Sequence, residues 1–154
     1  MTGTLQKALE ELKQKKIHIG WLEGAKYPDG TPVAEAAAVQ ELGSQKDHIP
    51  PRPFFRPTIA ARSNEWKKQY GDGSKAIFDG KETAGSVMQK IGLGIVGDVK
   101  KTISQITTPP LKSSTIEARR NRLKNGQGAS STIDKPLVDT GYMLNSLTSE
   151  VSDK

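Results

Sequence analysis

Asp139, Thr140 and Gly141 are the residues of this sequence whose types and spacing best fit catalytic chemistry. An Asp-Thr-Gly triplet can hold a carboxylate that shares one proton with a second carboxylate, and such a pair performs acid-base catalysis. The pair needs a second triplet, and the sequence contains no other Asp-Thr-Gly. The chemistry would therefore require two copies of the chain.

The same triplet is the only point at which the chain resembles a single-domain, homodimeric aspartic protease. After its triplet such an enzyme needs several more strands, flaps and a closing hydrophobic-glycine element, whereas 13 residues follow Gly141 here. In the alternative interpretation, Asp139 or Thr140 caps a short helix that begins near Tyr142. We predict that the triplet is a structural turn and that the chain is not an enzyme.

His18 and His48, the only histidines, are the remaining candidates for metal binding. They are 30 residues apart, and neither has a companion carboxylate at a ligand spacing such as i and i+4. The absence of cysteine excludes disulfides and thiolate metal sites. No serine lies in a nucleophile-elbow context, and no glycine-rich segment follows a strand in a phosphate-binding pattern. We expect no catalytic residue, metal, cofactor or small-molecule substrate.

A basic cluster is the strongest candidate for contact with a partner, and it consists of Arg119, Arg120, Arg122 and Lys124. The net charge of +6 fits attraction to nucleic acid, to a membrane surface or to an acidic protein. No aromatic residue is interleaved with the cluster, so the stacking platforms of single-strand binders are absent. An acidic partner surface, DNA and a plain solvated loop all remain open.

Hydrophobic periodicity at the start of the chain predicts a helix followed by a strand. The helix is predicted over Thr4–Lys15, where Leu5, Leu9 and Leu12 recur at helical spacing. Apolar and polar residues alternate over Lys16–Leu22, which predicts the strand. No apolar run approaches the roughly 18 residues that a membrane span requires, so we expect no membrane partner.

A second helix and a proline-rich arm follow. The helix is predicted from about Pro32 to Leu42, with Gly43 as its stop. Residues 44–57 contain four prolines between Pro50 and Pro57, which predicts an extended arm. The arm's phenylalanines either fill this subunit's core or insert into a neighbour. The candidate interface residues of the arm are Arg52, Pro53, Phe54, Phe55 and Arg56.

Two further helices are predicted in the middle of the chain. One runs from Pro57 to about Tyr70 and is broken by the glycines of residues 71–73. The other is long, from Ser74 to about Ile106, and its glycines at 92, 94 and 97 should permit close packing or a bend. The polar stretch 112–135 predicts a flexible basic loop, and residues 147–151 alternate like a final strand.

Together these elements predict an α+β fold, with a small, mainly antiparallel sheet packed against several helices that include one long helix. The proline-rich arm 44–57 and the mobile polar loop 112–135 would extend from it. A length of 154 residues fits a single domain over 1–154, and a hydrophobic fraction of 34% fits a modest core.

Four segments, taken in order, resemble a known family: the head-tail joining or tail completion proteins of long-tailed bacteriophages, also described as minor tail or virion morphogenesis proteins. The first is an alanine-rich helix that ends in Glu-hydrophobic-Gly, and the second is an Ile-Pro-x-Arg-Pro-Phe element. The segments are Val33–Gly43, Ile49–Pro57, Pro109–Ile116 and Lys135–Thr148. Each motif alone is weak, but their order and spacing are similar to the family's.

The resemblance implies a structural virion protein at the head-tail interface, or neck, that assembles with itself as a ring, expected to be a hexamer. Its partners would be neighbouring neck and tail proteins, with DNA in the lumen as a further contact. The protein would be located in the virion, in the tail or neck, and in the host cytoplasm during assembly. A tail terminator or a nucleic-acid-binding assembly protein is the alternative function.

Overall fold

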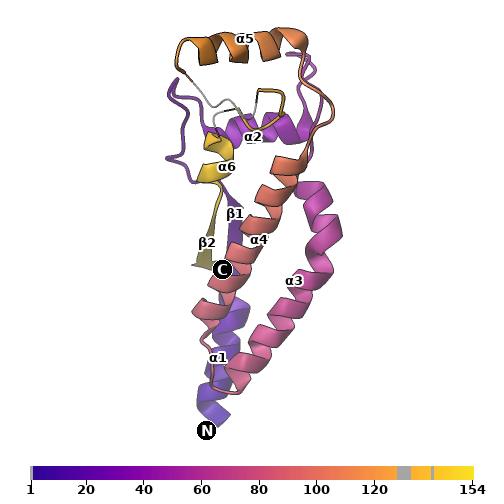
Figure 1. Cartoon of the computed structure of the whole chain (residues 1–154). Coiled ribbons are helices and arrows are strands. Elements are labelled where there is room, and N and C mark those ends of the chain that lie inside the picture. The colour runs from indigo at the N-terminus through magenta and orange to yellow at the C-terminus, as the bar shows by residue number, and fades with distance from the viewer. Residues whose placement is uncertain (1, 128–132, 140) are drawn as a thin grey trace. The chain divides into compact units, whose positions relative to one another are not determined.

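The computed structural model describes residues 2–127, 133–139 and 141–154 (Figure 1). Over these residues the chain forms six helices and one antiparallel sheet of two strands, which confirms the predicted α+β fold. The elements in order are α1 (Thr2–Gln14), β1 (Lys15–Gly20), α2 (Val33–Leu42), α3 (Phe55–Phe78), α4 (Ala84–Gln105), α5 (Ser113–Lys124), α6 (Tyr142–Ser146) and β2 (Thr148–Asp153).

The chain divides into two compact units, each assembled from separated segments. Unit 1 contains the chain up to Gly20, Thr58–Asp98 and Thr148–Lys154. Unit 2 contains Trp21–Pro57 and Val99–Leu147. Because a compact unit need not fold on its own, the prediction of a single domain over 1–154 stays a prediction.

The sheet of unit 1 pairs β1 with β2, with Ile17 opposite Val151 and His18 opposite Glu150. Ile17 and Ile19 are half-buried and His18 between them is exposed, as the alternation predicted. A Cβ atom on Gly92 of α4 would lie 3.2 Å from Ile17 Cγ2. The prediction that a glycine of this helix permits close packing is therefore confirmed at Gly92.

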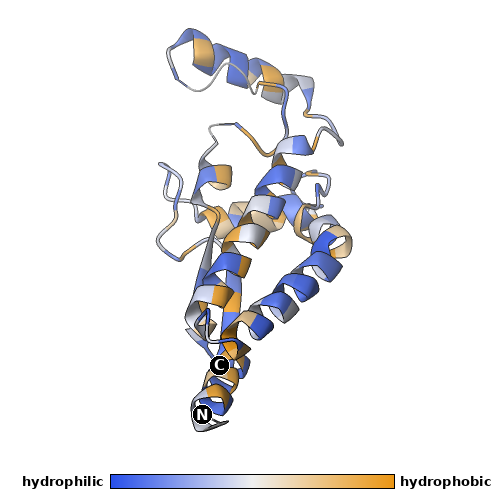
Figure 2. Cartoon of the chain, turned by 60° about the horizontal axis from the view of Figure 1, so that its bottom comes forward, coloured by the Kyte–Doolittle hydropathy of each residue, from blue (hydrophilic) through white to orange (hydrophobic). Residues whose placement is uncertain are grey.

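The core of unit 1 joins α1, α3 and α4. Its buried side chains are Leu12, Ile77, Ala84, Val87, Met88 and Ile91. In Figure 2 apolar colour is frequent on α4, whereas hydrophilic colour dominates α5. The leucines predicted to form the apolar side of α1 contribute one buried residue, Leu12, to this core.

The predicted helix break at residues 71–73 is wrong, because α3 continues through them to Phe78. A Cβ on Gly73 would lie 2.3 Å from Val87 Cγ1, so this glycine lets α3 and α4 approach closely. Gly80, two residues beyond the end of α3 at Phe78, has a φ of +71°. Gly80 N–H donates to Ile77 O and Lys81 N–H donates to Ala76 O, which is a Schellman arrangement.

The predicted long helix therefore begins later than Ser74, at Ala84. Thr83 caps it, because its Oγ1 accepts the backbone N–H of Ser86 at 3.2 Å. The predicted arm is also shorter than 44–57, since α3 begins at Phe55 and Pro57 lies in its first turn, where its missing N–H costs nothing.

The largest correction concerns the predicted flexible loop 112–135, where Ser113–Lys124 form α5. The half-buried stripe of this helix contains Ile116, Arg119 and Leu123 at positions i, i+3 and i+7. An arginine in the middle of the stripe hides the apolar period on which a helix prediction depends. Residues 128–132 of the predicted loop lie outside the described residues.

Candidate functional site: a basic pocket in unit 2

Arg52 is a buried charged residue of unit 2, with 5% of its surface exposed. Its Nε donates to Pro109 O at 2.7 Å and its Nη2 to Pro110 O at 3.0 Å. A weaker bond at 3.4 Å joins Nη1 to Gln40 Oε1. Arg52 therefore fastens the arm both to α2 and to the Pro-Pro segment before α5.

The guanidinium of Arg52 donates hydrogen bonds to uncharged oxygens: two backbone carbonyls and the Gln40 amide. Among the residues that the structure describes, no carboxylate forms an ion pair with its guanidinium. Burial lowers the pKa of Arg52, and the nearby charge of Arg119 lowers it further. The two guanidinium groups therefore face one region of unit 2, where the charge of Arg119 disfavours the charged form of Arg52.

Glu41 holds the other end of the arm. Its Oε2 accepts the backbone N–H of Phe54 at 2.6 Å and of Phe55 at 3.0 Å, and its Oε1 accepts Arg56 N–H at 3.2 Å. Arg56 Nε also donates to Oε1 at 3.0 Å. Burial raises the pKa of Glu41, but these bonds to the ionised form outweigh it and leave the pKa below its usual value.

The arm's aromatic residues fill unit 2 itself. Phe54 is fully buried, and its ring lies 6.0 Å from that of Trp21 and 4.9 Å from that of Phe55. Trp21 Nε1 donates to Met143 O at 2.8 Å, which ties the cluster to α6. Of the two alternatives left open for Phe54, a place in this subunit's own core is the observed one.

The basic cluster of α5 is divided between two faces. Arg119 lies 3.5 Å from Asp139 Oδ1 through its Nε, and Arg122 Nη2 donates to Asp139 Oδ2. Arg119 Nη1 also donates to Lys135 O at 2.7 Å. Arg120 and Lys124 are exposed on the other face. The four residues proposed as one contact surface are thus two structural residues and two solvent-facing ones.

The Asp-Thr-Gly triplet joins α5 to α6. Gly141, with a φ of +75°, occupies the N-cap position of α6 that was predicted for Asp139 or Thr140. Asp139 instead pairs with two arginines of α5, and Thr140 lies outside the described residues. The turn predicted over residues 139–141 stays a prediction, and the correction is that the N-cap of α6 is Gly141.

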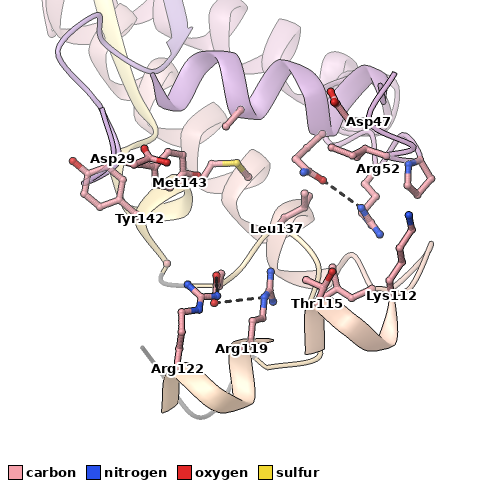
Figure 3. A pocket seen from close by; sticks show the side chains of 18 of the residues that line it. Asp29, Asp47, Arg52, Lys112, Thr115, Arg119, Arg122, Leu137, Tyr142 and Met143 are labelled. Atoms are coloured by element: carbon pink, nitrogen blue, oxygen red, sulfur yellow. Dashed lines mark hydrogen bonds and ion pairs between the residues drawn. The ribbon is translucent and has the colours of Figure 1, made fainter. Parts of the chain in front are cut away.

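These residues border a pocket of about 770 Å³ within unit 2 (Figure 3). Thr115, Arg119 and Arg122 of α5 point into it from one wall. Tyr142 and Asp29 lie at one end, and Asp47, Arg52 and Lys112 at the other. The apolar part of its lining includes Ile49, Pro50, Leu111, Leu137 and Met143.

The pocket combines cationic side chains with an apolar lining. Guanidinium and ammonium groups recognise carboxylates and phosphates, and an apolar lining with a few fixed polar groups is typical of ligand sites. Sequence reasoning missed the pocket because Arg52 and Arg119 are 67 positions apart. The one local signal was the arginine that interrupts the half-buried stripe of α5.

The two histidines are not brought together. His18 Nε2 lies 2.8 Å from Ser152 Oγ on the exposed face of the sheet in unit 1. His48 lines the pocket of unit 2 with a φ of +54°. Within the described ranges no group of three His, Cys, Asp or Glu residues could hold a metal ion, and no helix is long and apolar enough to cross a membrane.

Comparison with known proteins gives no match to a family model, to a curated protein or to a solved structure.

Proposed function

We propose that this protein is a structural component of a tailed-phage virion, a tail completion or head-tail joining subunit that acts as one copy of a ring in the neck. The proposal starts from the ordered motifs of the sequence that resemble that family. Its partners are other copies of the chain and the neighbouring neck and tail proteins.

The observation that carries the proposal is that the motifs contact one another within unit 2. The Arg52 side chain binds the Pro109–Pro110 segment and the Gln40 side chain, and Glu41 binds the arm. Met143, from the last motif, accepts the Trp21 indole N–H beside Phe54. All four segments of the resemblance thus belong to one connected network. Motifs that contact one another within the fold support a structural role.

The environment of Asp139 supports the same proposal. A protease carboxylate of the Asp-Thr-Gly type works by sharing a proton with a second carboxylate. Asp139 instead forms ion pairs with Arg119 and Arg122, which hold α5 in place. We therefore propose that the chain is not an enzyme.

Exposed apolar side chains of unit 2 are the groups available to a neighbouring copy. Leu42 is 67% exposed at the end of α2, and Leu22 is 56% exposed. Because Phe54 is internal, a ring contact in this unit uses such side chains and not the arm's aromatic core.

The proposal is tested by cryo-electron microscopy of the neck of the phage that encodes the chain, supported by light scattering and negative-stain images of the purified protein. We expect a ring between the portal-associated proteins and the tail tube. A mature virion that lacks the protein would refute the proposal and leave an assembly factor or a nucleic-acid binder as the better account.

A further inference from the structure

We infer that the pocket of unit 2 binds an acidic polypeptide segment, whose carboxylates lie between Lys112 and Arg119 within the field of Arg52. The apolar side chains of the segment cover the lining at Ile49 and Leu111. The inference rests on the proposed function only for the source of the segment, which is a neighbouring virion protein.

An excess of cationic groups at one end of the pocket is the first argument, because Arg52 and Lys112 lie there with the carboxylate of Asp47, whose Oδ2 accepts a hydrogen bond from Ser44 Oγ. Arg52 is bound by neutral oxygens, and Lys112 Nζ has no hydrogen bond or ion pair with any residue of the described ranges. Arg119 and Arg122 both pair with the carboxylate of Asp139. A carboxylate brought to this end gains charge-assisted hydrogen bonds and relieves the repulsion between Arg52 and Arg119.

The apolar lining is the second argument, because a ligand that covers it must have apolar groups as well as negative charge. Ile49, Leu111 and Leu137 border the same space as the cations. A free inorganic anion would leave these side chains uncovered. A volume of about 770 Å³ lies within the usual range for ligand pockets and accepts several side chains of a peptide.

The acidic residues of the pocket favour a polypeptide over nucleic acid. Asp29 and Asp47 lie at opposite ends of the pocket. Asp139, which also lines it, pairs with Arg119 and Arg122 of α5. Hydrogen bonds from the backbone and side chain of Thr31 lower the pKa of Asp29, so this group stays negatively charged. A nucleic acid carries a negatively charged phosphate on every nucleotide, and these carboxylates would repel it. A peptide can place apolar residues beside them.

The test measures fluorescence anisotropy of short labelled probes against the purified full-length chain. One probe is a peptide in which Glu and Leu alternate, the second has Gln in place of every Glu, and the third is a single-stranded oligonucleotide. We expect the acidic peptide to bind about tenfold more tightly than the Gln peptide, the effect of one close charge pair. Equal affinities for the two peptides, or tighter binding of the oligonucleotide, would overturn the inference.

Two exposed lysines at opposite ends of α5 supply a matched pair of variants. Lys112→Glu should weaken binding of the acidic peptide about tenfold, whereas Lys124→Glu, with the same change of net charge, should leave it unaltered. Thr115→Trp, which fills the pocket without changing charge, should also weaken binding. Equal losses of peptide affinity in the two lysine variants would show that the peptide is attracted by the net charge alone. That result would overturn the inference that the pocket binds it.

The outcome is separable from that of the proposed function. Binding of the acidic peptide by a chain that is absent from the neck would support the pocket and remove the neck assignment. If the chain is present in the neck but fails to bind the acidic peptide, the inference about the pocket is overturned and the proposed function stands.

Discussion

The carboxylate of Glu41 caps a helix to which it does not belong, because it accepts the backbone N–H of Phe54 at 2.6 Å, just before the first residue of α3. The next two backbone N–H groups bind the same carboxylate. A carboxylate at a helix N-terminus also interacts favourably with the helix dipole. One side chain of α2 therefore fixes where the arm ends and where α3 begins.

Glu41→Gln should lower the free energy of unfolding by about 1–3 kcal/mol, because a neutral amide cannot accept charge-assisted bonds from three backbone groups and from Arg56. Urea denaturation followed by circular dichroism measures the change. Glu23→Gln, the same substitution at an exposed loop position, is the control and should change stability little. Equal effects of the two substitutions would contradict the capping role.

The same carboxylate predicts a dependence of stability on pH. The pKa of Glu41 is lower in the folded protein than its ordinary value of 4.5, so folding favours the ionised form. The stabilisation is complete above pH 4.5 and is lost as the pH falls through the lowered pKa of the folded state. Urea midpoints measured between neutral and acidic pH should fall more steeply in the natural protein than in Glu41→Gln; parallel curves would count against this assignment.

Arg52→Lys should destabilise the protein although it keeps the charge. A lysine ammonium cannot reproduce the guanidinium fork that binds Pro109 O and Pro110 O, and the loss of bonds from a charged donor costs about 1.5–3 kcal/mol. The midpoint of thermal unfolding measures the effect. Arg120→Lys, on the exposed face of α5, should leave that midpoint unchanged. A stable Arg52→Lys variant would show that the fork is dispensable.

Gly43→Ala should also destabilise unit 2. Gly43 has a φ of +77°, and a Cβ there would lie 2.9 Å from Ile49 O and from Pro51 N. A side chain at such a position costs on the order of 1–3 kcal/mol. Gly24→Ala provides the comparison, because its Cβ would meet no atom within 4 Å and its φ is not positive. The result is read from urea midpoints, and identical values for the two variants would contradict the expectation.

Phe54→Ala tests the core and the proposed function together. Removing a fully buried phenylalanine ring costs about 3–5 kcal/mol, so we expect unit 2 to lose its packing and heads to fail to join tails. Phe78→Ala, at a position that is 61% exposed, should be nearly neutral. Plating efficiency of the two mutant phages gives the measurement. Fully infectious particles from the Phe54 mutant would refute the role of this ring.

Local patterns predicted the elements whose apolar residues follow one period. The alternation at Ile17 and Ile19 gave β1, and the alanine-rich run before Gly43 gave α2. Predictions failed where a long-range contact outweighs a local signal. Gly73 reads as a helix breaker, but it lies where α3 passes close to Val87 of α4, and packing keeps the helix intact there.

The candidate site was predictable in composition but not in geometry. The basic residues of α5 were visible as a cluster, and the arm was visible from its prolines. The bonds from Arg52 to Pro109 and Pro110 join residues more than 50 positions apart, and no local pattern reports them. The division of the cluster into Arg119 and Arg122 on one face and Arg120 and Lys124 on the other depends on α5 being a helix, which the interrupted stripe concealed.

The pairing of β1 with β2 has a consequence for synthesis on the ribosome. Ile17 pairs with Val151, so the sheet of unit 1 joins residues made at widely separated times. Every residue of unit 2, from Trp21 to Leu147, has been translated before Thr148 begins β2. Contacts between such distant positions form slowly, because a long loop must close first. The sheet of unit 1 therefore closes only after every residue of unit 2 has been made.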